Sequence, residues 1–154
     1  MLRSLQPLIA AHPFAQDLPA EHLELLVGCA LNRVYQPGEY LIREGDPADY
    51  FFLIRQGKVL VEVAAPGSGD LPVQTLGDGE VLGWSWLIPP YRYRFNARAL
   101  EFTRTLSLNG ACLRDKCEED YHLGYELMKR FNRVLVARLE AARLQMLDLY
   151  AAQD

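Results

Sequence analysis

The feature of this sequence that most restricts its fold is a series of short apolar runs between residues 30 and 109. Turn residues such as Pro37-Gly38 and Gly57 separate these runs, and Pro followed by Gly suits a type II turn. Short strands with turns every 8–12 residues or so are typical of an antiparallel sandwich or barrel. The predicted strands lie at about 30–35, 40–43, 50–55, 58–64, 71–76, 95–100 and 103–109.

Both flanks of this β region are expected to be helical. Pro19 suits the first position of a helix that ends near Gly28. Near the other end, residues 110–117 predict a short helix, and residues 119–150 predict a long helix without proline. The 154 residues suit one domain, 1–154, made of a helical segment 1–29, a β unit 30–109 and C-terminal helices 110–154.

The predicted long helix carries more apolar surface than one core contact needs. Its apolar residues, from Leu123 to Tyr150, span an arc of about 180°, whereas a surface helix needs a stripe of about 100°. A deeply seated helix would explain this arc, and so would a two-fold homodimer, which we favour. The residues predicted at the dimer contact are Leu127, Phe131, Val134, Arg138, Ala142 and Gln145.

Composition excludes several classes of protein. Acidic residues (20) outnumber basic ones (16), so nothing in the net charge of −4 supports direct contact with nucleic acid. No run approaches the ~20 apolar residues of a membrane span, and the apolar patch near the N-terminus is too short for a signal peptide. The three cysteines are an odd number without metal-type spacing, which predicts a cytoplasmic protein with reduced, buried thiols.

Catalytic and metal sites are not indicated. The histidines, His12, His22 and His122, all lie outside the β region, whereas a barrel metalloenzyme would cluster them on strands. No serine lies in a Gly-x-Ser-x-Gly elbow, and no phosphate loop of the Gly-x-x-x-x-Gly-Lys type is present. We therefore expect a protein that is not an enzyme and that needs no cofactor and no metal.

One loop, Gly77 to Leu100, could bind an anion. A turn led by Gly83 offers free backbone N–H groups, and three arginines follow it with no acidic residue between positions 81 and 100. Arginine side chains can add paired hydrogen bonds to a phosphate. Alternatively, these arginines are solvated loop residues that cover tyrosines. The arginines are Arg92, Arg94 and Arg98, and the tyrosines are Tyr91 and Tyr93.

From about Phe14 to Asp148 the chain resembles the cyclic-nucleotide-binding domain of catabolite-activator and FNR-like regulators. The resemblance rests on LPAEHL (18–23), YQPGEYLI (35–42), EGDPAD (44–49), FLIRQGKV (52–59) and GEVLG (79–83). It implies a mainly β fold, an antiparallel, jelly-roll-like β-roll (a double-stranded β-helix), between an N-terminal helix and a long C-terminal helix that usually dimerises. It also places a phosphate-binding cassette at Gly83.

The cassette departs from the family pattern. The family's ribose-binding Glu is replaced by Trp84, and a small residue near the nucleotide is replaced by Trp86. The family's phosphate-binding Arg falls at Tyr93 or Arg94. The candidate ligand-binding residues are therefore Gly83, Trp84, Ser85, Trp86, Arg92 and Arg94.

These observations predict a cytoplasmic, non-enzymatic sensor or regulatory domain for a small anionic ligand, with weak or absent binding of cyclic AMP and cyclic GMP. The signal would pass through movement of helix 119–150. One alternative is a ligand-free protein–protein interaction module. In it, the two tryptophans fill the space where relatives bind their ligand, and the final helix binds a protein partner. Another is a genuine cyclic-nucleotide-binding protein. No segment suited to a helix-turn-helix follows the long helix, so we expect no direct binding of nucleic acid and none of membranes.

Overall fold

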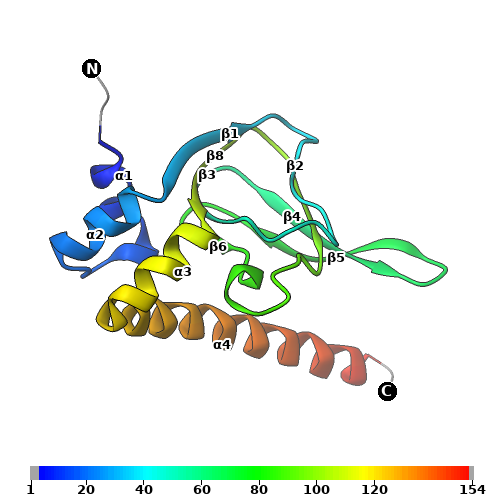
Figure 1. Ribbon diagram of the computed structural model, residues 1–154. Coiled ribbons are helices and arrows are strands. Elements are labelled where there is room, and N and C mark those ends of the chain that lie inside the picture. The colour runs from blue at the N-terminus through cyan, green and yellow to red at the C-terminus, as the bar shows by residue number, and fades with distance from the viewer. Residues whose placement is uncertain (1–3, 153–154) are drawn as a thin grey trace.

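The computed structural model describes residues 4–152 and contains eight strands between two groups of helices (Figure 1). The strands run as expected from alternating apolar runs and turns, and Gly38 has the positive φ (89°) that the predicted type II turn requires. Only β6, two residues long, was not predicted. The strands are β1 (Ala30–Tyr35), β2 (Tyr40–Ile42), β3 (Tyr50–Gln56), β4 (Val59–Ala65), β5 (Gly69–Leu76), β6 (Val81–Leu82), β7 (Asn96–Ala99) and β8 (Thr103–Asn109).

The strands form two four-stranded antiparallel sheets, in the orders β1-β8-β3-β6 and β2-β7-β4-β5. Strands close in sequence, such as β3 and β4, belong to different sheets, so the chain winds around a shared interior. This confirms the predicted mainly β, antiparallel β-roll with helices at both ends. The β4–β5 hairpin projects from the roll on the side away from α1 and α2 (Figure 1).

Helices cover one end and one side of the roll. The N-terminal group is α1 (Gln6–Ala11), the 3-10 turn η1 (Pro13–Ala15) and α2 (Ala20–Val27), for which Pro19 is the capping residue. After β8, α3 (Gly110–Glu119) leads into α4 (Tyr121–Ala151), which runs along the lower side of the molecule in Figure 1. Asn109 and Asp120 cap α3 and α4 with their side-chain oxygens, which explains where both helices begin.

Two apolar clusters result from this arrangement. The first lies between the helices and the β1-β8-β3-β6 sheet, and it includes Leu26, Phe51 and Phe131. The second lies between the two sheets and includes Ile42, Val59 and Leu82. The loop after β6 borders both clusters, because Leu82 belongs to the second and Trp86 to the first.

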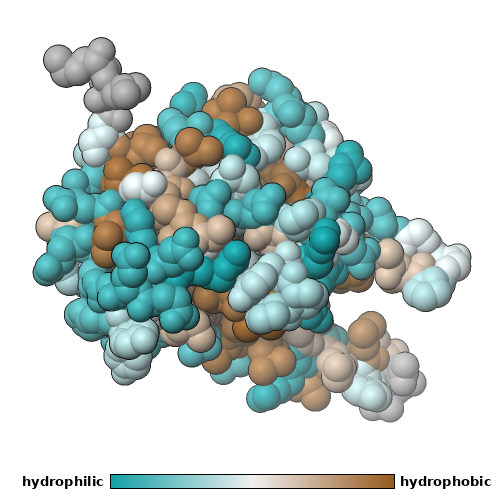
Figure 2. Space-filling view, in the orientation of Figure 1, coloured by the Kyte–Doolittle hydropathy of each residue, from teal (hydrophilic) through white to brown (hydrophobic). Residues whose placement is uncertain are grey.

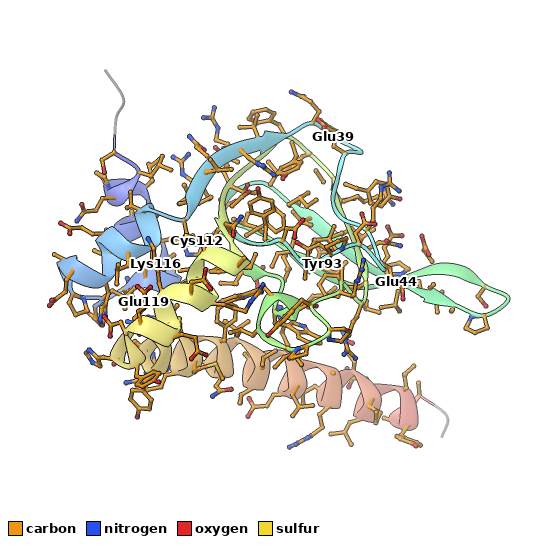
Figure 3. All side chains as sticks on the ribbon, in the orientation of Figure 1. Glu39, Glu44, Tyr93, Cys112, Lys116 and Glu119 are labelled. Carbon is orange, nitrogen blue, oxygen red and sulfur yellow. A yellow bond between two sulfur atoms is a disulfide. The ribbon has the colours of Figure 1, made fainter. Side chains whose placement is uncertain are left out.

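The expectation of reduced cysteines is wrong. Cys29 and Cys112 form a disulfide, with Cα atoms 5.7 Å apart, and only Cys117 is free. Pairing of β1 with β8 explains the contact, since Ala30 lies opposite Leu108 and the two cysteines flank this end of the pair. Figure 3 shows Cys112 and Lys116 of α3 on the side toward α2, where Lys116 Nζ donates to the carbonyl of Leu25 (3.0 Å). Cysteine content therefore no longer supports a cytoplasmic location.

Candidate ligand-binding site

The loop between β6 and β7 begins with a conformation that suits glycine. Gly83 has a φ of 96°, in the left-handed region that side chains disfavour. The space around it is ordinary, because an added Cβ would lie 3.6 Å from the nearest atoms of Phe51 and Tyr50. The backbone turn therefore accounts for glycine here, and it directs the chain into the short 3-10 helix η2 (Ser85–Leu87).

The first turn of η2 has unused hydrogen-bonding capacity. No side chain caps it, since Trp84 occupies the capping position. Ser85 is 1% exposed, and its Oγ has no hydrogen-bond partner among residues 4–152. A buried hydroxyl without a partner is uncommon and costly, so it indicates a position where a ligand or a water molecule can bind.

The three arginines of the loop have different surroundings. The guanidinium of Arg94 is exposed and its Cζ lies 5.8 Å from the ring centroid of Trp84. Arg92 instead donates to the carbonyl of Gly45 (3.2 Å), in the turn after β2. Arg98 pairs with Glu62 of β4 at 2.8 Å. Arg94 is therefore the guanidinium that the structure places beside the Gly83 loop, and Arg92 belongs to a different turn.

Trp86 lies in the core. It is fully buried, and its indole stacks on Phe51 with ring centroids 5.0 Å apart and an interplanar angle of 19°. The ring of Phe131, on α4, lies 5.6 Å away. This burial places the ring in the core between the loop, β3 and α4, and its Nε1 has no hydrogen-bond partner among the described residues, so a ligand contact of Trp86 stays a prediction. Trp84, by contrast, is half-buried at the surface of the loop.

Tyr93 lies at one of the two positions where the resemblance places the phosphate-binding arginine. It is buried, and its hydroxyl donates to the carbonyl of Tyr50 (2.6 Å) and accepts from the amide of Tyr50 (3.1 Å). Burial raises the pKa of Tyr93 to about 12. Tyr93 therefore stays neutral and fastens the loop to β3, which leaves Arg94 as the charged group of the pair.

Sequence reasoning missed one further residue of the loop. Arg114 of α3 donates to the carbonyl of Trp86, and its guanidinium stacks on Tyr91, 4.0 Å from the ring centroid. The loop thus contacts α3 through Arg114 and α4 through Phe131. A basic residue directly after Leu113 in a short helix was the only sequence signal for Arg114, and it named no partner.

The residues predicted at a dimer contact divide into three groups, buried, half-buried and exposed. Leu127 and Phe131 are 1% and 2% exposed and belong to the core, so the structure contradicts their assignment to an interface between protomers. Val134 is half-buried, as is Arg138, which donates to the carbonyl of Val81. Ala142 and Gln145 are exposed. The error follows from the wide arc, whose one side covers the roll.

A different apolar stripe on α4 is exposed. Its large residues are Met128, Leu135, Leu139, Met146 and Leu149, between 39% and 68% exposed. Figure 2 shows hydrophobic residues along the lower edge of the molecule, where α4 lies. This stripe is available for a partner.

Residues 32–120, more than half of the chain, match the cyclic nucleotide-binding domain family, and the chain belongs to this family. The domain is a regulatory ligand-binding unit in its relatives. The chain is 36% identical over 75 residues (47% of this chain) to human cGMP-dependent protein kinase 2 and 28% identical over 134 residues (86% of this chain) to the mouse potassium/sodium hyperpolarization-activated cyclic nucleotide-gated channel 2. It spans only 10% and 14% of these relatives.

Solved structures agree with this assignment. A putative cyclic nucleotide-binding protein from Geobacter metallireducens is 27% identical, with a TM-score of 0.78 over 90% of this chain and 99% of that one. The catabolite activator protein of Thermus thermophilus is 25% identical, with a TM-score of 0.69 over 90% of this chain and 63% of that one. Within residues 4–152, no helix has both the length and the apolarity of a membrane span.

Proposed function

We propose that this protein is a non-catalytic regulatory domain that binds a small anion at the loop formed by Gly83, Ser85 and Arg94. The observation that carries the proposal is the buried Ser85 hydroxyl without a partner, next to the left-handed turn at Gly83. Arg94 supplies a positive charge to the loop. Among the described residues, no acidic side chain forms an ion pair with Arg94.

Cyclic AMP and cyclic GMP fit this loop poorly. The resemblance assigns a carboxylate acceptor for the ribose hydroxyl to the position of Trp84, whose indole offers only a donor. A hydrogen bond to a charged group contributes about 1.5–3 kcal/mol, so its loss weakens binding roughly tenfold to a hundredfold. The proposed ligand is therefore an anion recognised mainly through its phosphate or carboxylate end.

Contacts from the loop to the helices provide a route for the signal. Trp86 lies between Phe51 of β3 and Phe131 of α4, and Arg114 of α3 bonds to the carbonyl of Trp86. Ordering of the Ser85 turn by an anion would reposition Trp86, and this would shift α4 at Phe131. The ligand would thereby bias the position of the helix whose outer stripe is exposed.

The outer stripe of α4 fits a second copy of this chain. From Tyr121 to Leu149 the exposed residues repeat in the 3-4 spacing of a coiled coil, with Asn132 at a core position of the repeat. A single core Asn favours one register in a parallel dimer. Leu139→Glu is expected to yield monomers in light scattering, whereas Glu140→Gln, on the neighbouring exposed position, is expected to leave the dimer intact. A monomeric unmodified protein at high concentration would contradict this interface.

A ligand-free interaction module on the same fold is the second candidate, and the burial of Trp86 favours it. Residue-resolved NMR separates the two functions. Titration of the unmodified protein with inorganic pyrophosphate is expected to shift the amide signals of Gly83 and Ser85. Absence of any shift in this loop would reject the anion site and leave the interaction module.

For the location we retain the cytoplasm as a prediction, to be tested by the oxidation state of Cys29 and Cys112 in cells.

A further inference from the structure

A hollow lies on the opposite face of α4 from the exposed stripe. It has a volume of about 480 Å³ and separates α4 from the segment after α1 and from the turn between β5 and β6. Its lining includes Phe14, Gly79 and Val81, and it shares no residue with the Gly83–Arg94 loop. A hollow of this volume lies in the range of small-molecule sites, roughly 300–1,000 Å³.

Small side chains on α4 create the space. Leu127 and Phe131, nearer the start of the helix, are almost fully buried in the core. Farther along the same face, Ala137 and Ala141 line the hollow, and one methyl group each is too short to reach the roll. The alanines therefore leave the hollow open beside the point where Arg138 reaches the carbonyl of Val81.

Three arginines of α4 border the hollow, and one of them is structural. Arg130 is buried, and its guanidinium donates to the carbonyls of Phe14 (2.9 Å) and Gln16 (2.6 Å) and to the carboxylate of Glu126 (2.7 Å). These contacts join α4 to the N-terminal segment. Since its charge is paired and its donors are used, Arg130 holds the wall of the hollow and is not free to bind a ligand.

The other two arginines, Arg133 and Arg138, lack acidic partners. Neither has a carboxylate within 4 Å among the described residues. Arg138 donates only to the backbone carbonyl of Val81, and burial lowers the pKa of its guanidinium. Burial outweighs the opposing effect of the nearby Glu80 carboxylate on this pKa, so an anion in the hollow would stabilise the partly buried charge of Arg138 further.

Two acidic residues also face this region and limit what can bind. Glu80 accepts a hydrogen bond from the amide of Gly77 (2.6 Å), which holds its carboxylate at the β5–β6 turn, and Asp17 is exposed at the rim. These carboxylates disfavour a bulky polyanion that fills the hollow with charge. They suit a compact anion whose charged end meets the two arginines and whose remainder carries hydrogen-bond donors.

We propose that this hollow is a second ligand site, separate from the Gly83 loop, for a small molecule that carries a phosphate or carboxylate group bound by Arg133 and Arg138. Such a ligand would bridge α4 to the β5–β6 turn beside the hydrogen bond from Arg138 to Val81. It would thus act on the position of the same helix that the loop contacts through Trp86.

Arginine side-chain NMR tests this site directly. The Nε–Hε signals of Arg133, Arg138 and Arg94 are followed in titrations with inorganic pyrophosphate, citrate and adenosine 5′-monophosphate, so that phosphate and carboxylate ligands are distinguished. We expect saturable shifts of the Arg133 and Arg138 signals with at least one probe. Arg138→Gln should weaken that binding by at least roughly tenfold, whereas the matched control Arg94→Gln should change it less than about twofold.

Two further variants keep the test decisive if Arg138→Gln does not fold. Arg133→Gln removes an exposed charge, and Ala141→Leu fills the hollow without changing charge; each is expected to weaken the same probe. The proposal is overturned if no probe binds with a Kd below about 1 mM, or if binding survives Arg133→Gln and Ala141→Leu unchanged. Loss of loop shifts in Arg94→Gln alone bears only on the Gly83 site, so failure of one site is distinguishable from failure of the other.

Discussion

Trp84 and Trp86 are two positions apart in the same loop, yet they lie in different surroundings. The indole of Trp86 is fully buried between Phe51 and Phe131, whereas Trp84 is half-buried and faces the guanidinium of Arg94. Trp84 lies at the N-terminal cap of η2, whereas Trp86 lies within η2. Identical residue types in one motif can therefore serve as core and as the border of a site, and their positions relative to the turn decide which.

The largest expected difference between the two tryptophans is in stability. Trp86→Ala should lower the free energy of unfolding by about 3–5 kcal/mol, because it opens a cavity in the first apolar cluster. Trp84→Ala should cost less than about 1 kcal/mol, since the ring already contacts water. Urea unfolding of both variants measures this contrast. Equal losses would show that the two side chains have the same role.

The disulfide joins Cys112 of α3 to Cys29, which follows α2, and it is expected to stabilise the same fold. It closes a segment of 83 residues between Cys29 and Cys112. Its loss, by reduction or by Cys29→Ser, should cost about 2–4 kcal/mol and lower the Tm by roughly 5–15 °C. Cys117→Ser is the matched control and should change the Tm little. A Tm that does not respond to reductant would mean that the disulfide does not stabilise the fold.

On the binding side of the loop, Arg94 and Arg92 should behave differently. Arg94→Gln is expected to weaken pyrophosphate binding at Gly83 and Ser85 by roughly ten- to a hundredfold, the value of a charge-assisted hydrogen bond of about 1.5–3 kcal/mol. Arg92→Gln should leave this affinity within about twofold, because Arg92 bonds to the carbonyl of Gly45. NMR titration of the Gly83 amide measures both. The reverse order would transfer the anion role to Arg92.

A smaller effect is expected from restoring an acceptor at the border of the site. Trp84→Glu should raise the affinity for cyclic AMP by roughly tenfold, the lower end of the about 1.5–3 kcal/mol that a hydrogen bond to a charged group contributes. Trp84→Gln, which lacks the charge, is the control and should gain less. If neither variant gains affinity, the indole is not what weakens cyclic nucleotide binding.

The sequence predicted the strands and long helices well because turn residues and apolar periodicity are local signals. The strand β6 was not predicted because two residues are too few to show a periodicity. The disulfide was not predicted because Cys29 and Cys112 are 83 residues apart and meet only when β1 pairs with β8. The burial of Trp86, Leu127 and Phe131 could not be predicted, because an apolar residue on a wide helix arc or in a loop does not reveal which side meets the core. Gly83 was predicted as an anion-binding residue from its local chemistry, whereas Ser85 was added with the family resemblance.

Calorimetry of the unmodified protein with cyclic AMP and cyclic GMP tests the central claim that the anion end of the loop persists while the sugar end does not. The account predicts no binding of either nucleotide, or binding weaker than about 10 µM. Micromolar or tighter binding that Arg94→Ala abolishes would contradict it, because it would show that Trp84 is compatible with full recognition of the nucleotide.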